Sequence, residues 1–315
     1  MRRLISLLVS LAILAVIYAR VDPAEIAGAF ASANAVWLAV SLGMVVPLTL
    51  LTAHRLVRIV PRERPLGFGE SLSLTLAGST MNLVLPSKMG DVAKGWFLTS
   101  RGHLRGGQAL ALVVFEKGFD MLSLLLWCAL GLSFVSARSP LFWPLAAAVT
   151  LGTAAGVLVL LSRSVSARVF ALVRRFAGER LGARIDSTAA GWGAVQESLL
   201  ESPARLAGVA ALSIFIWFLH LLQIWLFAVA LGGTVPFLAS LGIAPLAILA
   251  GLLPLTFAGV GTRDAALIVL YQPWLAPAAA AALGVLCTMR YLIPGIAGLP
   301  VLGRYLGELR RDRLV

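Results

Sequence analysis

Three ionisable residues interrupt an apolar stretch near the middle of the chain. Glu116, Lys117 and Asp120 lie within residues 108–135, where most neighbours are Leu, Val, Phe and Trp. At helical spacing Glu116 and Asp120 share one face. Lys117 precedes Asp120 by three residues and can reach its carboxylate. Each charge at membrane depth costs about 2.5–3.5 kcal/mol, so the three require partners or a water-filled cavity. We expect a binding site here; the alternative is a charge cluster at the membrane interface, since Glu116 lies only about 12 Å from the helix start.

Two shorter apolar segments each stop at a Leu-Pro pair. Residues 74–94 read LTLAGSTMNLVLPSKMGDVAK, and residues 246–264 read LAILAGLLPLTFAGVGTRD. Proline removes a backbone donor and disfavours the helical conformation of the preceding residue, and each run is shorter than the roughly 20 residues that cross a bilayer. A break at membrane depth is tolerated where it is buried in protein or lines a wet cavity. Two such segments in corresponding positions indicate the binding site of a transporter.

Polar side chains follow the first break and are candidate ligands for a substrate. Lys88 and Lys94 are expected to attract an anion. Asn82 either offers its amide to the cavity or satisfies a local backbone group. Asp91 either contacts the substrate or caps the helix that follows.

A second candidate set surrounds the second break. Arg263 follows two glycines at an expected helix start, where backbone amides favour anions and the guanidinium fork suits phosphate. Asp264 either belongs to this site or caps the helix. Arg290 lies inside the apolar run 286–293, so it is expected to face the interior and pair with Asp264 or with a ligand phosphate. A purely structural ion pair is the alternative for Arg290.

The composition is that of an all-α polytopic membrane protein. Hydrophobic residues make up 60% of the 315 residues, charged residues only 13%, and the mean hydropathy is +0.94. The net charge of +12 comes from basic loops, which the positive-inside rule explains better than nucleic-acid binding. Both cysteines, Cys128 and Cys287, fall in apolar runs, and the three histidines lack metal-ligand spacing. We therefore expect no disulfide, no metal and no cofactor.

Hydropathy and loop charge predict about six full spans plus two re-entrant broken hairpins. The N-terminal apolar run lacks a small-residue cleavage site and is expected to be a retained span. The second span is expected to end at the cytoplasmic pair His54-Arg55. Basic flanks place both termini in the cytoplasm and the protein in the cytoplasmic (inner) membrane. The predicted spans are about 4–19, 35–53, 108–135, 142–161, 208–230 and 278–302.

The predicted elements form a single integral membrane domain, 1–315, with an inverted-topology repeat. Repeat 1 covers about 35–135 and repeat 2 about 208–302, each with one broken hairpin, and the two run with opposite polarity. The linker at about 162–207 is strongly basic and carries apolar residues at helical spacing. It is expected to form amphipathic helices on anionic lipid, with a solvated basic linker as the alternative.

These motifs resemble the flippase-like membrane domain of lysylphosphatidylglycerol synthases and of stand-alone relatives associated with hopanoid and polyprenyl-phosphate-sugar lipids. The resemblance rests on Asn82-x-x-Leu85-Pro86-x-Lys88-x-Gly90-Asp91-x-x-Lys94, Glu116-Lys117-x-x-Asp120 and Leu253-Pro254…Gly259-Val-Gly261-Thr-Arg263-Asp264. The family pattern usually shows arginine where this chain has Lys88, Lys94 and Lys117, and often glutamate where it has Asp264. Lysine keeps the charge but lacks the bidentate guanidinium fork, so the identity of the lipid head group is left undetermined.

The resemblance implies a lipid flippase that moves an anionic or lipid-linked head group by alternating access. The expected partners are a phospholipid, a polyprenyl-phosphate-linked lipid or a hopanoid, together with anionic lipid head groups and no nucleic acid. The chain ends soon after the last predicted span, so the aminoacyl-transferase domain and its enzymatic activity are not expected. A secondary transporter of a small soluble anion and a membrane partner subunit of a lipid-modifying enzyme remain alternatives. A glycosyltransferase is disfavoured because no DxD-type nucleotide-sugar site is found. The oligomeric state and any proton coupling through the carboxylates stay open.

Overall fold

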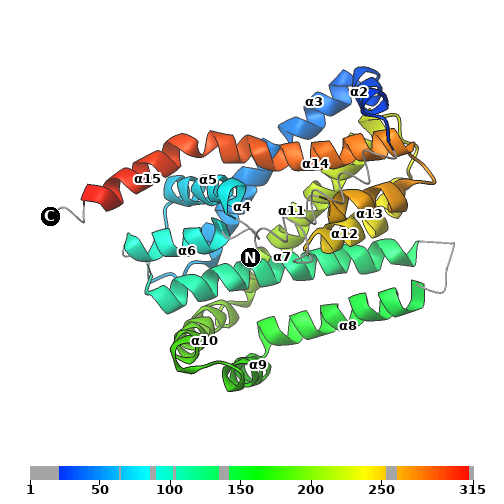
Figure 1. The fold of residues 1–315 in the computed structure, drawn as a ribbon. Helices are drawn as coiled ribbons and strands as arrows, with labels where there is room; N and C mark the ends of the chain where they lie inside the picture. Colours follow the sequence, from blue (N-terminus) through cyan, green and yellow to red (C-terminus); the bar gives the residue numbers. More distant parts are fainter. Residues whose placement is uncertain are drawn as a thin grey trace.

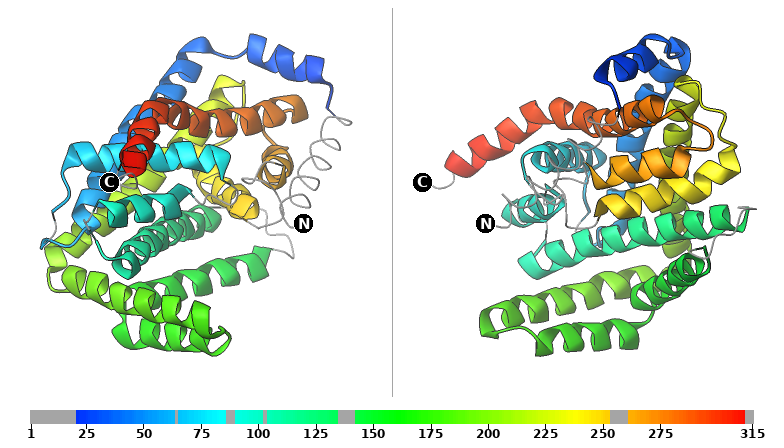
Figure 2. Two further views of the ribbon diagram at one scale, coloured as in Figure 1. Left: turned by 60° about the vertical axis from the view of Figure 1, so that its left-hand side comes forward. Right: turned by 45° about the vertical axis from the view of Figure 1, so that its right-hand side comes forward.

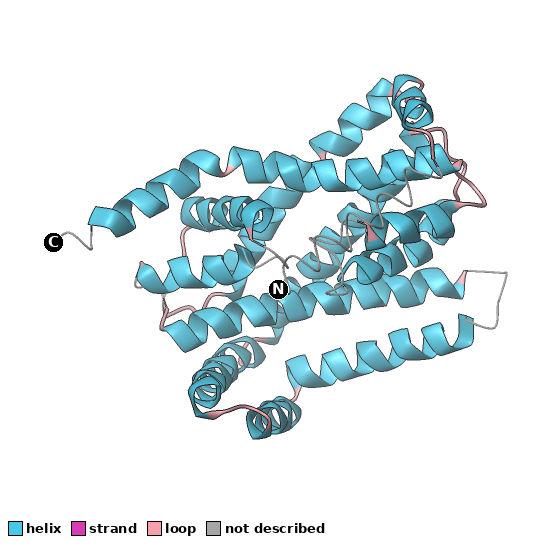
Figure 3. Cartoon of the chain, viewed as in Figure 1, coloured by secondary structure: helices cyan, strands magenta, loops and turns pink. Residues whose placement is uncertain are grey.

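Every regular element in the described part of the chain is an α-helix, as Figure 3 shows. The computed structural model describes residues 21–63, 65–85, 90–101, 104–134, 142–252 and 261–311. The predicted span at 4–19, the candidate Lys88 and both Leu-Pro breaks at Pro86 and Pro254 lie outside these residues. Helices satisfy their backbone hydrogen bonds internally, as a lipid environment requires. The prediction of an all-α polytopic membrane protein is confirmed.

Four stretches of the described residues are long and apolar enough to cross a membrane. They agree with the spans predicted at 35–53, 142–161, 208–230 and 278–302, but three ends differ. The first stretch continues to Ile59, the third begins at Pro203, and the last ends at Ala297 because Gly298 caps it. The four are α3 with α4 (Ala35–Gly43 and Val45–Ile59), α8 (Phe142–Leu161), α11 (Pro203–Ala230) and α14 (Pro277–Ala297).

The 28-residue helix α7 (Gly106–Ser133) is the centre of the molecule. It packs against α4, α8 and α11 among the long helices and spans the width of the molecule in Figure 1. Its length is that of a membrane span, and it carries the three charges predicted within 108–135. The helices α4, α6 (Gly90–Ser100), α8, α10 (Glu179–Leu200), α11 and α12 (Phe237–Leu252) are arranged on the faces of α7.

Two pairs of short helices correspond to the two broken segments. The first pair is α5 (Phe68–Val84) with α6 (Gly90–Ser100), and the second is α12 (Phe237–Leu252) with α13 (Thr262–Tyr271). The members of each pair pack against each other, α14 packs along α5, and α7 packs along α12. Each pair thus contacts a long helix from the other half of the chain. The inverted-topology repeat and the re-entrant orientation of the two pairs stay predictions.

Glycines allow the closest of these contacts. A Cβ atom on Gly131 of α7 would lie 2.0 Å from the backbone nitrogen of Gly242 of α12. In the first pair, a Cβ on Gly90 would lie 2.2 Å from the carbonyl oxygen of Gly78. Both distances are shorter than any side chain tolerates, so the helices touch backbone to backbone at these points.

The buried apolar side chains form two main clusters, one around each short-helix pair. The first-half cluster contains Leu74 of α5, Phe97 of α6 and Phe115 of α7. The second-half cluster contains Ile248 of α12 and, from α13 and α14, further apolar side chains such as Leu267 and Leu283. Burial of this kind contributes about 25 cal/mol per Å² of apolar surface. The halves are therefore two packed bodies that meet along α7, α11 and α14.

Below α7, a layer of α8, α9 (Arg163–Arg175) and α10 (Glu179–Leu200) covers one side of the molecule (Figures 1 and 2). α9 lies within the linker predicted at 162–207, and Phe176, which caps its end, is 85% exposed next to Arg174 and Arg175; its placement on lipid stays a prediction. α10 differs: it buries Trp192, Val195 and Leu199 against the first-half cluster. Two further amphipathic elements, α2 (Pro23–Ala31) and α15 (Leu299–Arg311), complete the described chain.

Candidate functional site

A cavity of about 370 Å³ lies where the two halves meet. Its wall takes side chains from α4, α5, α6, α7, α11, α13 and α14, that is, from both short-helix pairs and the long helices between them. It brings together eight of the ten residues predicted for the site. These are Asn82, Asp91, Lys94, Glu116, Lys117, Asp120, Arg263 and Arg290.

Glu116 is buried at the centre of an ionic network in this wall. Its Oε1 lies 3.1 Å from Nη2 of Arg55 on α4, and its Oε2 accepts a hydrogen bond from Nζ of Lys94 on α6. All three side chains are at most 4% exposed. A carboxylate so deeply buried is stable only with such partners, and here each oxygen has one cation. The pairing ties α4 and α6 to α7.

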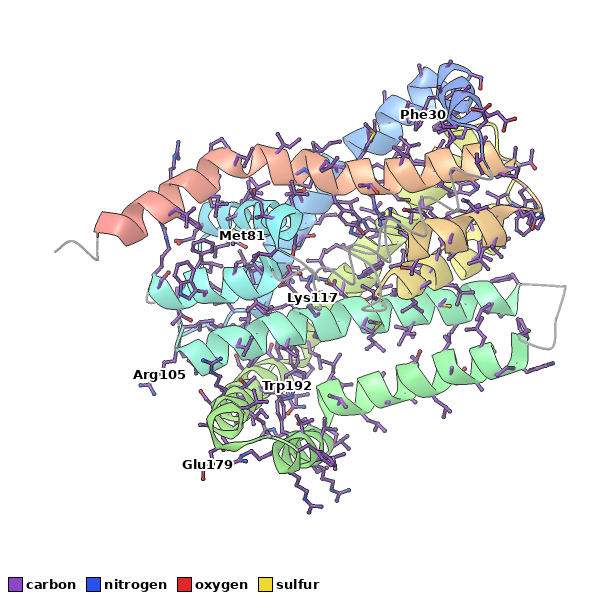
Figure 4. All side chains as sticks on the ribbon, viewed as in Figure 1. Phe30, Met81, Arg105, Lys117, Glu179 and Trp192 are labelled. Carbon is purple, nitrogen blue, oxygen red and sulfur yellow. The ribbon has the colours of Figure 1, made fainter. Side chains whose placement is uncertain are left out.

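Asp120 extends the network one turn further along α7. Its Oδ1 accepts hydrogen bonds from Nη1 of Arg55 at 2.6 Å and from the indole nitrogen of Trp217 at 3.1 Å. Its Oδ2 lies 3.2 Å from Nζ of Lys117, and that ammonium also lies 3.1 Å from Asp91 of α6. Charges therefore alternate in sign along the whole network. Its most exposed member is Lys117, which is 47% exposed and lies near the middle of α7 in Figure 4.

Arg55 is a charged site residue that sequence reasoning missed; Trp217 and Gln223 were not predicted either. We expected it at the cytoplasmic end of a span, next to His54, but α4 continues past it and the side chain is only 1% exposed. The expectation was wrong because the apolar pattern weakens at His54 while the helix does not end there. The signal that could have found it lies in α7, where Glu116 and Asp120 outnumber the single nearby Lys117 and therefore need a second cation.

Asn82 and Gly90 join the two helices of the first pair. Asn82 Oδ1 accepts a hydrogen bond from the backbone N–H of Gly90 at 2.8 Å, which satisfies one of the free amides at the start of α6. Of the two roles predicted for Asn82, the structure therefore displays the backbone role, although the residue also lines the cavity. The contact fixes α6 so that Asp91 and Lys94 face α7.

Arg263 and Asp264 form a compact pair at the start of α13. Asp264 Oδ1 accepts from Arg263 Nη2 at 2.7 Å, and its Oδ2 accepts from the backbone N–H of Gly261 at 3.0 Å. Gly261 adopts φ 103°, a conformation that favours glycine. Asp264 is thus a helix cap and the counter-charge of Arg263, and it lies behind the cavity wall. The guanidinium of Arg263 also donates to Thr288 Oγ1 at 2.7 Å, so protein groups already hold it.

Arg290 of α14 differs from every other cation of the cavity. It is 4% exposed, yet in the described part of the chain no carboxylate pairs with it. Its Nη2 donates to the hydroxyl of Tyr291 at 2.8 Å, its Nη1 lies 3.5 Å from the carbonyl oxygen of His220, and its buried Nε has no acceptor. The predicted pairing with Asp264 is wrong, because Asp264 pairs with Arg263.

Apolar side chains line the rest of the same cavity. Val45 and Leu48 come from α4, Leu83 from α5, and Leu292 and Pro294 from α14. Leu292 is 38% exposed on the outer surface as well as part of this wall. The cavity can thus hold a ligand that is polar at one end and apolar at the other.

Comparison with known proteins identifies the fold as that of a described membrane family. Residues 3–298 match the family model described as the lysylphosphatidylglycerol synthase transmembrane region. The chain belongs to this family. A UPF0104 membrane protein of Methanothermobacter thermautotrophicus is similar to it, with 24% identity over 317 residues that cover 93% of this chain and 94% of the relative. The family resemblance predicted from the motifs is confirmed, and the protein is a multi-pass membrane protein.

Proposed function

We propose that the protein is a lipid translocator that moves an anionic or lipid-linked head group across the cytoplasmic membrane. The observation that carries the proposal is the cavity between the two halves, which combines a buried ionic network with an apolar wall. Charged groups at membrane depth are usual where a substrate path runs, and binding sites of transporters lie between repeats. Family membership supports a lipid-related role.

The apolar wall favours a lipid over a small soluble anion. A soluble anion needs cations and water around it, whereas Leu48, Leu83 and Leu292 offer surface that suits acyl chains. Membership of a family described from a lipid-modifying synthase points the same way. The role is transport and not catalysis in this proposal, and a partner-subunit role is the alternative.

Alternating access would follow from movement of one half against the other. The short-helix pairs α5–α6 and α12–α13 each lie in one hydrophobic cluster, so each pair would move as a packed unit. In this proposal the two halves form an inverted repeat and both termini face the cytoplasm. The basic, partly apolar α9 would rest on anionic lipid.

Reconstitution in liposomes tests the function. Head-group translocation is measured for phosphatidylglycerol, aminoacylated phosphatidylglycerol, a polyprenyl-phosphate sugar and a hopanoid, with a soluble anion flux assay alongside. We expect selective movement of one lipid and its loss in Glu116→Gln, because that change leaves Lys94 and Arg55 with less counter-charge. Glu197→Gln is the matched control, since its carboxylate is 54% exposed, pairs with Arg163 and does not line the cavity. The proposal would be contradicted if the protein moved only the soluble anion. It would also be contradicted if the folded protein moved none of the lipids and no anion.

A further inference from the structure

Among the described residues, the cavity carries an excess of positive charge that a negatively charged ligand would balance. The cations are Arg55, Lys94, Lys117, Arg263 and Arg290, and the carboxylates around them are Asp91, Glu116, Asp120 and Asp264. Four of the five cations contact at least one of these four carboxylates, and Arg290 contacts none of them. Among the described residues, one positive charge therefore remains, and it is buried. A buried cation without an anion is unfavourable, so the site favours a ligand with one negative charge.

A second unsatisfied group lies near Arg290. Gln223 of α11 is fully buried and lines the same cavity. Its Nε2 donates to the carbonyl oxygen of Ser41 at 2.7 Å, which fixes the amide orientation, because the oxygen atom would be repelled by that carbonyl. Its Oε1 is left buried without a donor. This atom can be satisfied only by a hydroxyl or an N–H.

The two groups are neighbours through α11. Nη1 of Arg290 faces the carbonyl oxygen of His220 at 3.5 Å, and Gln223 follows His220 by three residues. A helix carbonyl oxygen points one turn along the helix, toward the residues three and four positions later, so Arg290 Nη1 lies on the turn that carries Gln223. One head group can therefore present an anionic group to Arg290 and a hydrogen-bond donor to Gln223 within the same cavity.

We propose that Arg290 and Gln223 form the head-group subsite, and that the transported lipid carries a singly charged phosphodiester next to a hydroxyl. Arg290 would bind the phosphate with its guanidinium fork, and Gln223 Oε1 would accept from the hydroxyl. This inference rests on the proposed function and names its substrate class. A phosphomonoester carries too much negative charge for the site, and a zwitterionic head group too little.

Equilibrium binding tests the subsite independently of transport. Purified protein in detergent is titrated with dioctanoyl phosphatidylglycerol, and with dioctanoyl phosphatidylpropanol, which has the same charge but lacks both head-group hydroxyls. Binding is measured by native mass spectrometry. We expect wild type to bind phosphatidylglycerol about tenfold more tightly than the propanol lipid, the size of one buried hydrogen bond. Equal affinities would overturn the role of Gln223 without the need for any variant.

Variants separate the two contacts. Arg290→Gln is expected to lower the affinity for both anionic lipids by about tenfold or more, while Arg290→Lys, which keeps the charge, recovers part of that affinity. Gln223→Leu is expected to lower the affinity for phosphatidylglycerol alone, to the value measured for the propanol lipid. Dioctanoyl phosphatidylcholine should bind more weakly than either, and the deacylated glycerophosphoglycerol tests whether the acyl chains are needed. Unchanged binding of both anionic lipids in folded Arg290→Gln would overturn the proposal, as would equal affinity for the lipid and its deacylated head group.

The two proposals can fail separately. If the lipids bind as expected but are not translocated in liposomes, the subsite proposal is supported and the translocator proposal is contradicted. Translocation of a lipid that binds equally well to wild type and Arg290→Gln would retain the translocator and overturn the subsite.

Discussion

Arg55 and Glu116 form an ion pair in which both side chains are at most 2% exposed, with Nη2 of the arginine 3.1 Å from Oε1 of the glutamate. The same guanidinium reaches Asp120 with its other terminal nitrogen at 2.6 Å. One arginine from α4 therefore bridges two carboxylates on successive turns of α7, and Lys94 and Lys117 complete the charge balance. The two contacts of Arg55 link α4 electrostatically to α7.

Loss of Arg55 should destabilise the protein strongly. Arg55→Gln leaves Glu116 and Asp120 buried with less counter-charge, and breaking one side of a buried pair costs about 3–5 kcal/mol. Thermal unfolding in detergent measures the effect. Arg58→Gln on the same helix is the control, because Arg58 is exposed and its loss should cost less than about 1 kcal/mol. Similar unfolding temperatures for the two variants would contradict the assigned role of Arg55.

Asp264 should show two separable contributions to stability. Asp264→Asn keeps an acceptor for the Gly261 amide but removes the counter-charge of Arg263, whereas Asp264→Ala removes both. The alanine variant should therefore be less stable than the asparagine variant by about 1 kcal/mol, the usual value of a helix cap. Unfolding curves of both variants give the difference, with exposed Asp186→Asn as the control. An asparagine variant as stable as wild type would rule out the charge contribution.

The contact between α7 and α12 should not tolerate a side chain at Gly131. The new Cβ in Gly131→Ala would lie 2.0 Å from the backbone of Gly242, so the helices must separate, at a cost of about 3 kcal/mol or more. Gly43→Ala is the matched control, because nothing lies within 4 Å of a Cβ at that position. Thermal unfolding should separate the two variants clearly. If the Gly131 and Gly43 variants unfold at the same temperature, α7 and α12 do not cross as closely as described.

Cysteine labelling should distinguish the cavity wall from the packed core. Ser79 lines the cavity, whereas Ser123 of α7 is only 2% exposed and does not. Ser79→Cys should react with a small hydrophilic thiol reagent, and Ser123→Cys should not. The native Cys128 and Cys287 are fully buried and give a low background. Equal labelling of the two introduced cysteines, followed by mass spectrometry, would contradict a water-accessible cavity.

The ionic residues of the first half could be predicted from sequence because they stand out locally. Glu116, Lys117 and Asp120 lie within five residues in an apolar run, and Asp91 and Lys94 follow a Leu-Pro break. Their types and positions sufficed to predict a shared site. Their partners could not be predicted in full, because an ion pair such as Arg55–Glu116 joins residues 61 positions apart.

The second half was harder to predict, because the sequence does not indicate which of its two arginines pairs with Asp264. Arg263 and Arg290 were both candidates for an anion site, and Asp264 was a candidate partner for Arg290. Only the three-dimensional packing of α13 on α14 decides between them. A Cβ on Gly284 would lie 2.9 Å from Asp264 Oδ1, so this glycine lets the two helices approach until Asp264 and Arg263 pair. Gln223 carried no sequence signal, because a single amide in an apolar helix does not reveal its neighbours.

The alternation of charge along the network has an electrical consequence. Three cations and three carboxylates join α4, α6 and α7, so the group as a whole is neutral. Moving a unit charge across the membrane potential changes its free energy by about 2.3 kcal/mol per 100 mV, whereas moving a group with no net charge involves no such change. Displacement of the network during a transport cycle would therefore be insensitive to voltage. Within the described cavity wall, the unbalanced charge that would respond to voltage is that of Arg290. It would be cancelled when a singly charged lipid is bound and present when the carrier returns without one.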